Sequence, residues 1–349
     1  MRRYAYGLLL LALMLAACAP SPDEPLEITF IDVGQGAAVL LDSDAATVLV
    51  DGGQGQHAYE HLRAEDIDSL DLIVASHAHA DHIGGFTPIL ENLAVEEIWY
   101  NGQTHTTQTF ERFIDAALES DARYTEPTRG DRRSFGSLGI EVLHPTTSAA
   151  DYEGDLHDKN IVVRAHYGDV AALLPGDAED DVEGELIDAG VDLKAEILKM
   201  GHHGSRTSSS APFVEAVDPE IAVYQASDGN QYGHPHDEAL SNVTRTGAEV
   251  YGTDVSGTIR ITTEGRDLTV HSASPAADRP VADAPDDSCV DINDAAPETL
   301  TEIIHVGPDG AASIEQKRPF EAVEELDRVD GIGPARLNDI QEQDLACAP

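Results

Sequence analysis

The chain has 349 residues, more than an average single domain, which predicts one large domain with a smaller one attached. It carries 65 acidic and 21 basic residues, a formal net charge of −44. Because 41% of its residues are hydrophobic, it can fill a core, and the composition excludes a disordered chain. We interpret the acidic surface as halophilic, since salt screens self-repulsion; an ordinary acidic exported protein is the alternative.

The N-terminus predicts export. Arg2 and Arg3 precede an apolar run, Gly7 to Ala17, which is too short to span a membrane. The run ends in Leu-Ala-Ala-Cys at Cys18, which resembles a bacterial lipobox and implies a lipoprotein signal peptide over residues 1–18. A plain secretory signal is the alternative. Residues 19–26 would form a tether, and the lipid on Cys18 would anchor the protein to the membrane, facing the periplasm or the exterior.

Short apolar runs and helical patterns alternate from residue 27 to residue 274 and predict an α/β sandwich. The predicted strands are Leu26–Ile31, Ala37–Leu41, Thr47–Val50, Leu70–Ala75, Glu97–Tyr100, Ile140–Leu143, Ile161–His166, Val170–Leu174, Glu196–Met200 and Ile221–Tyr224. The predicted helices are His82–Leu93, Thr109–Ser120, Asp180–Ala189, Ala211–Ala216 and His236–Thr246.

Four potential metal ligands follow the Leu70–Ala75 run within six residues. They are His77, His79, Asp81 and His82. Imidazole nitrogen and carboxylate oxygen are the ligands that zinc prefers, and this spacing can place His77 and His79 on one ion and the other two on its neighbour. The pattern predicts two divalent ions as cofactors, zinc or alternatively manganese. Helix capping is the other interpretation of the cluster.

The pattern His-x-His-x-Asp-His resembles the signature of the metallo-β-lactamase superfamily, which implies an αββα sandwich. Five more segments occur in the matching order, and together they are similar to the hydrolase domain of the competence protein ComEC. These segments are residues 30–36, 49–53, 173–178, 198–205 and 232–235. The resemblance covers residues 27 to 273.

The resemblance also implies the rest of the metal site. Asp177 would bridge the two ions, because one carboxylate can span the ~3.5–4 Å between them. His202 or His203 would complete the second ion; we favour His202, which leaves His203 to contact the substrate. The remaining histidine of the first ion would be His157, with His144 as the alternative.

Further residues would support the chemistry around the ions. Asp32 and Asp51 would either orient ligand imidazoles or cap turns. The resemblance places Lys199, Ser205 and His236 against substrate phosphate. It assigns catalytic roles to Asp81, His203 and His234. Two ions would lower the pKa of a water molecule and neutralise charge in the transition state, so no cysteine or redox step is needed.

A linker over residues 275–288 separates this domain from a helical one over residues 289–349. Here Val329–Leu337 forms a glycine turn that opens a helix, and it resembles the second hairpin of a helix-hairpin-helix domain like that of the competence DNA receptor ComEA. The resemblance implies that backbone N–H groups hold a DNA phosphate. The expected DNA-binding residues are Gly331, Gly333 and Arg336.

Two features of this module oppose DNA binding. The first hairpin has Val306 where a glycine is expected and Asp309 where an anion would sit. The domain also carries 14 acidic and 4 basic residues, so it repels phosphate, and packing or protein binding is the alternative role. Cys289 and Cys347 bracket the domain, and a disulfide between them would stabilise it by roughly 3–4 kcal/mol.

The favoured function is therefore a lipid-anchored nuclease for DNA uptake or scavenging, with DNA as the partner. A hydrolase of small phosphoesters or lactones with the same fold is one alternative. A DNA-binding lipoprotein without catalysis is another, which the nearly complete ligand set disfavours.

Overall fold

The computed structural model describes residues 24–150, 154–271 and 290–347, apart from residues 294, 302, 321, 344 and 345. The predicted lipidation site Cys18, the predicted linker 275–288 and Cys289 lie outside the described residues. Within the described ranges, no helix has the length and apolar character needed to cross a membrane.

The first sheet of the large domain has eight strands, which come from both the beginning and the end of the domain sequence. Its strand order is β17-β16-β1-β2-β3-β5-β7-β8, antiparallel from β17 to β3 and parallel from β3 to β8. The strands are β1 (Leu26–Phe30), β2 (Val39–Ser43), β3 (Ala46–Val50), β5 (Leu72–Ala75), β7 (Glu97–Tyr100), β8 (Arg123–Thr125), β16 (Ile259–Thr263) and β17 (Leu268–His271). Two short strands, β4 (Ser69–Leu70) and β6 (Ala94–Val95), pair beside it.

The second sheet has seven strands in the order β15-β14-β13-β12-β11-β10-β9. Strands β9 to β12 are antiparallel and β12 to β15 are parallel, so β12, β13, β14 and β15 all end at one edge. They are β9 (Arg132–Phe135), β10 (Leu138–His144), β11 (Val162–Tyr167), β12 (Val170–Leu174), β13 (Ile197–Lys199), β14 (Ile221–Tyr224) and β15 (Glu249–Gly252).

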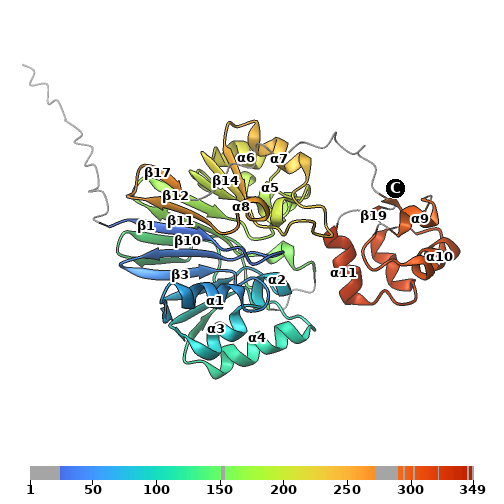
Figure 1. Cartoon of the computed structure of the whole chain (residues 1–349), viewed down its shortest axis with the longest axis horizontal. Coiled ribbons are helices and arrows are strands. Elements are labelled where there is room, and N and C mark those ends of the chain that lie inside the picture. Colours follow the sequence, from blue (N-terminus) through green and yellow to red (C-terminus); the bar gives the residue numbers. More distant parts are fainter. Residues whose placement is uncertain are drawn as a thin grey trace, which may run out of the picture.

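The two sheets pack face to face with helices on both outer faces (Figure 1). Alternate strand residues such as Val74 and Val163 fill the space between the sheets, as the pleat requires. The first sheet is covered by α1 (His57–Ala64), α3 (Phe86–Asn92) and α4 (Gln108–Glu119). The second is covered by α5 (Asp180–Asp188), α6 (Ala211–Val217) and α7 (Asp237–Thr244). The predicted αββα sandwich is confirmed.

Each predicted strand overlaps a strand of the structure, but the predicted helix His82–Leu93 is two helices, α2 (Ala80–Ile83) and α3. They separate at Gly84-Gly85, where the chain passes so close to the β3 loop that a Cβ on Gly85 would lie 1.9 Å from the Gly52 carbonyl oxygen. The elements that were not predicted are α1, the short helix α8 (Thr253–Ser256) and the strands β6, β8, β9, β15, β16 and β17.

The C-terminal residues form a small helical unit with its own core. Its elements are β18 (Val290–Asp291), α9 (Pro297–Leu300), α10 (Pro308–Lys317), the 3₁₀ helix η4 (Val323–Arg328), α11 (Pro334–Gln343) and β19 (Ala346–Cys347). Strands β18 and β19 pair and so join the two ends of the unit. Cys347 is disulfide-bonded, as predicted; its expected partner Cys289 lies outside the described residues.

Candidate metal centre

Loops at the carboxyl ends of strands from both sheets bring the predicted ligands together. The loop after β5 and the helix α2 that follows it carry His77 to His82, the loop after β12 carries Asp177, and the turn after β13 carries His202 and His203. His157 opens a short 3₁₀ helix, η1 (His157–Lys159), before β11. Nitrogen and oxygen atoms of these residues form overlapping groups whose members lie within 4.8 Å of one another.

The first group is His77, His79 and His157. The Nε2 of His77 lies 2.9 Å from the Nδ1 of His79, and the His157 ring centroid lies 4.9 Å from that of His79. The Nε2 of His157 is buried and has no hydrogen-bond partner. The alternative residue, His144, instead has its Nδ1 2.8 Å from the carbonyl oxygen of Asn160 and belongs to none of the groups found among the described residues.

The second group is Asp81, His82 and His203. The Nε2 of His203 lies 3.1 Å from the Asp81 carboxylate and 3.3 Å from the Nε2 of His82. His202, which the sequence analysis favoured here, lies instead with His157 and Asp177. His203 takes the place expected for His202 because both residues adopt left-handed backbone conformations, with φ of 45° and 56°. This turn directs each ring differently from a regular helix.

Asp177 lies between the two groups. Its Oδ2 is 2.9 Å from the Nε2 of His82 and 3.1 Å from the Nε2 of His203, and it also groups with His77 and with His157. Its Oδ1 is buried without a hydrogen-bond partner. The side chain of Asn160 accepts a hydrogen bond from the Asp177 backbone N–H at 3.1 Å and so holds the carboxylate in place.

The residues fit a pair of divalent ions. Buried polar atoms normally have partners, and an ion on each side of Asp177 would satisfy both the Oδ1 of Asp177 and the Nε2 of His157. The donor set also matches the chemistry, since it combines imidazoles with two carboxylates that reach the same space. The centre therefore resembles a two-ion site in ligand type, burial and arrangement.

Electrostatics divides the histidines into two sets. Burial lowers the pKa of His77 and His79 well below the ordinary value, which keeps them neutral, the form that binds metal. Burial also acts to lower the pKa of His82 and His203, but Asp177 and its neighbouring carboxylates raise both above the ordinary value. Without ions, these imidazoles and carboxylates neutralise one another.

The two predicted supporting aspartates differ in their contacts. Asp51 accepts hydrogen bonds from Ser76, and its Oδ2 lies 2.8 Å from the Nδ1 of His82, so it orients that ring. Asp32 is exposed, and its carboxylate accepts the backbone N–H of Gly34 at 3.0 Å. It caps a turn and contacts no ligand imidazole, so for Asp32 the turn-capping alternative holds.

Two supporting residues were not foreseen. Glu179 has its Oε1 3.3 Å from the Nδ1 of His202 and 3.7 Å from that of His157, so it can hold both rings. The backbone carbonyl of Gln225 lies 3.0 Å from the Nδ1 of His203. Glu179 could have been noticed because it follows Asp177 by two residues; a backbone carbonyl leaves no signal in a sequence.

The 232–236 loop places two residues expected to contact substrate, His234 and His236, side by side, with ring centroids 5.0 Å apart. The His234 ring centroid lies 5.6 Å from that of His202, and its Nε2 is buried without a partner. The Nδ1 of His236 accepts the Arg206 backbone N–H at 3.0 Å, and burial lowers the pKa of His236 to about 4. The Nε2 of His234 is thus unpaired among the described residues, while His236 holds the loop.

Lys199 and Ser205 differ from the expectation that they contact substrate. Lys199 is buried, donates to the Gly176 carbonyl oxygen at 3.1 Å and lies 3.7 Å from the Oδ1 of Asp177. Ser205 is also buried, with its hydroxyl 3.1 Å from that of Thr207. The contacts of both side chains therefore stabilise the loops that carry Asp177 and His202.

In the C-terminal unit, the predicted glycine turn is present. Gly331 has φ of +95°, Pro334 begins α11, and Arg336 donates to the Gly331 carbonyl oxygen at 3.0 Å. Gly331, Gly333 and Arg336 are all exposed. The turn is therefore accessible to a ligand.

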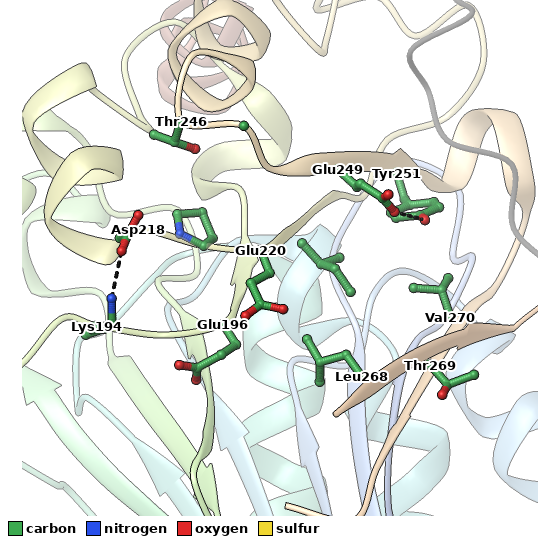
Figure 2. Close-up of a pocket in the computed structure, with 13 residues that line it drawn as sticks. Lys194, Glu196, Asp218, Glu220, Thr246, Glu249, Tyr251, Leu268, Thr269 and Val270 are labelled. Carbon is green, nitrogen blue, oxygen red and sulfur yellow. Dashed lines mark hydrogen bonds and ion pairs between the residues drawn. The ribbon is translucent and has the colours of Figure 1, made fainter. Parts of the chain in front are cut away.

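A cavity of about 840 Å³ lies at the opposite ends of β13, β14 and β15 from the metal centre (Figure 2). Most of its charged groups already have partners: Lys194 pairs with Asp218 at 2.7 Å, and Glu249 accepts the Tyr251 hydroxyl at 2.7 Å. Glu196 likewise accepts the Ala171 backbone N–H. This cavity gives no reason to place chemistry there.

The four-layer fold and the buried histidine–aspartate centre define a class of metal-dependent hydrolases. Residues 31–227, more than half of the chain, match the metallo-β-lactamase superfamily, and the chain belongs to that superfamily. Residues 286–343 match the helix-hairpin-helix motif.

Three curated relatives are similar to this chain. ComE operon protein 3 of Bacillus subtilis is 29% identical over 67% of this chain and 32% of its own length. Competence protein ComA of Neisseria gonorrhoeae is 31% identical over 68% of this chain and 32% of its own. Exodeoxyribonuclease WalJ of Streptococcus pneumoniae is 27% identical over 49% and 64%, respectively. The chain thus spans about a third of the length of the two competence proteins.

Proposed function

We propose that this protein hydrolyses phosphodiester bonds in DNA at a centre of two divalent ions, zinc or manganese. The observation that carries the proposal is the position of Asp177 between His77, His79 and His157 on one side and Asp81, His82 and His203 on the other. The similarity to proteins named for competence and for exodeoxyribonuclease activity supports DNA as the substrate.

The ions, when bound, would supply an acidified water molecule and positive charge for a phosphate oxygen. Asp81, His82 and His203 would hold one ion and His77, His79 and His157 the other, with Asp177 shared. The Asp51 carboxylate holds the His82 ring in the orientation that directs its Nε2 into the centre.

His234 is the residue we assign to the substrate. Its Nε2 is free, and burial, reinforced by neighbouring imidazoles, lowers the pKa of His234 well below the ordinary value. The ring is therefore neutral, and its N–H can donate to a phosphate oxygen or to the leaving oxygen. His202, held by Glu179 through its Nδ1, has its ring centroid 5.6 Å from that of His234.

A small phosphoester is the second candidate substrate. The net charge of −44 repels a polyanion at low salt, and the helical unit is itself acidic. The exposed Gly331 turn favours DNA instead, because its N–H groups can hold a phosphate despite the surrounding charge.

We also propose that the protein acts outside the cytoplasm. The basic pair at Arg2, the short apolar run and Cys18 support an exported lipoprotein whose hydrolase domain lies outside the cytoplasmic membrane. The acidic composition supports a protein that works in a salt-rich medium.

The test is incubation of the metal-loaded protein with single- and double-stranded DNA and with bis-p-nitrophenyl phosphate, at low and at molar salt. We expect DNA cleavage that stops on chelation and in Asp81→Ala, and that persists in the exposed control His271→Ala. Turnover of bis-p-nitrophenyl phosphate with intact DNA would favour the small-substrate alternative.

A further inference from the structure

A second cavity, of about 350 Å³, adjoins the metal-binding loop. From His79 in that loop, neighbouring rings run through His157 and His202 to His234. Ala80, which lies in its wall, sits between the proposed ligands His79 and Asp81 and is exposed. The rest of the wall comes from the loop after β3, from α3 and from the first turns of α4. His105, just before α4, has its ring centroid 6.3 Å from that of His79, which connects the metal centre to this side of the molecule.

The wall is rich in hydrogen-bond donors that have no partner. The donors are Gln54, Gln56, Thr87, Thr109 and Arg112. Across the ranges that the structure describes, none of these side chains forms a hydrogen bond or an ion pair. Glu91 is the one carboxylate in the wall. The glutamine and threonine side chains can each donate to a phosphate oxygen, and Arg112 adds the positive charge that an anion requires.

The Arg112 side chain has neither a hydrogen bond nor an ion pair among the described residues. Acidic residues outnumber basic ones by 65 to 21, and exposed arginines elsewhere, such as Arg63 and Arg266, pair with an aspartate. Arg112 is exposed beside the cavity with no such partner among the described residues. An unpaired guanidinium can bind a phosphate through two parallel N–H groups without first losing a carboxylate.

We propose that this cavity binds a nucleotide that flanks the scissile bond, with its phosphate on Arg112, when a single DNA strand lies across the metal centre. The inference rests on the proposed function and adds the direction in which the strand runs, from His234 past the ions toward α4. A volume of about 350 Å³ suits a single nucleotide unit.

The experiment measures inhibition of bis-p-nitrophenyl phosphate hydrolysis by a short single-stranded oligonucleotide that carries uncleavable linkages. This reports only on strands bound at the metal centre, so binding by the helical unit does not interfere. Arg112→Gln should raise the inhibition constant about 3- to 10-fold, and Glu91→Gln should lower it about 2-fold. Arg266→Gln removes the same charge far along the sequence and should leave the constant unchanged.

The dependence of the inhibition constant on salt concentration provides a second test. The slope of the logarithm of the inhibition constant against log salt should fall by roughly 0.7 in Arg112→Gln, the value for one phosphate contact to a single strand. Turnover of bis-p-nitrophenyl phosphate itself should be unchanged in all three variants, which also shows that they fold. Equal constants in Arg112→Gln and Arg266→Gln would overturn the inferred nucleotide site, whereas intact DNA in the wild-type assay would overturn the proposed function.

Discussion

The Nε2 of His203 lies 3.1 Å from the carboxylate of Asp81, although one residue follows a strand of the second sheet and the other a strand of the first. This contact joins the two halves of the sandwich at their shared edge. It also makes His203, rather than His202, the partner of Asp81 and His82.

The first prediction separates these neighbouring histidines. His203→Ala should lose one of two bound ions and reduce phosphodiester hydrolysis on the order of 10³-fold, because several kcal/mol of charge stabilisation disappears. His202→Ala should keep both ions. Mass spectrometric metal analysis after dialysis checks this, and the opposite pattern would restore the assignment favoured by the sequence.

The second prediction concerns Asp51, which orients His82 through a 2.8 Å contact. Asp51→Asn should weaken metal binding about 10- to 100-fold, since the amide cannot hold the ring in the same way. Asp32→Asn is the control, because Asp32 caps a turn and contacts no ligand ring. Chelator competition measures both affinities, and an equal loss in the two variants would refute the role of Asp51.

The third prediction concerns Glu97, a buried carboxylate at the β7 edge. Burial acts to raise the pKa of Glu97, but hydrogen bonds from Arg133, Arg123 and Trp99 outweigh it and hold the pKa at about 2. A lowered carboxyl pKa stabilises the fold above the unfolded value near 4.5, and this contribution is lost as pH falls toward 2.

Glu97→Gln should therefore lower the free energy of unfolding by about 2 kcal/mol at pH 7, a figure reduced for the solvent exposure of Arg123, and by clearly less at pH 3. Urea unfolding at the two pH values measures the difference. Glu141→Gln, which removes a more exposed ion pair with Arg132, should cost under about 1 kcal/mol. A pH-independent effect of Glu97→Gln would contradict the linkage.

The fourth prediction concerns the disulfide of Cys347. With Cys289 as partner, reduction should destabilise the helical unit by roughly 3–4 kcal/mol while leaving metal binding unchanged. Thiol titration of the denatured, unreduced protein should find no reactive thiol beyond position 18, and two such thiols would rule the pairing out.

The sequence predicted the parts of the site that are local in the chain. His77 to His82 form a dense motif after an apolar strand, and Asp177 ends another, so their convergence follows from strand ends that share an edge. The choice between His202 and His203 could not be made, because it depends on two left-handed backbone angles. Lys199 resembled a substrate residue only because its burial is invisible in the sequence.

The fold, like the site, has parts that the sequence predicts and parts that it does not. Strands with long apolar runs were predicted within a few residues, whereas β8 and β9 are short, polar and partly exposed, so little hydrophobic pattern marks them. The strand order, which places β16 beside β1 and β17 beyond β16, arises from contacts between the ends of the domain that no local pattern encodes.

The most direct test of the central claim is anomalous diffraction from crystals loaded with zinc or manganese. We predict two peaks about 3.5–4 Å apart, one ringed by His77, His79 and His157 and the other by Asp81, His82 and His203, with Asp177 touching both. A single peak, or peaks away from Asp177, would contradict the two-ion centre and the hydrolytic chemistry that depends on it.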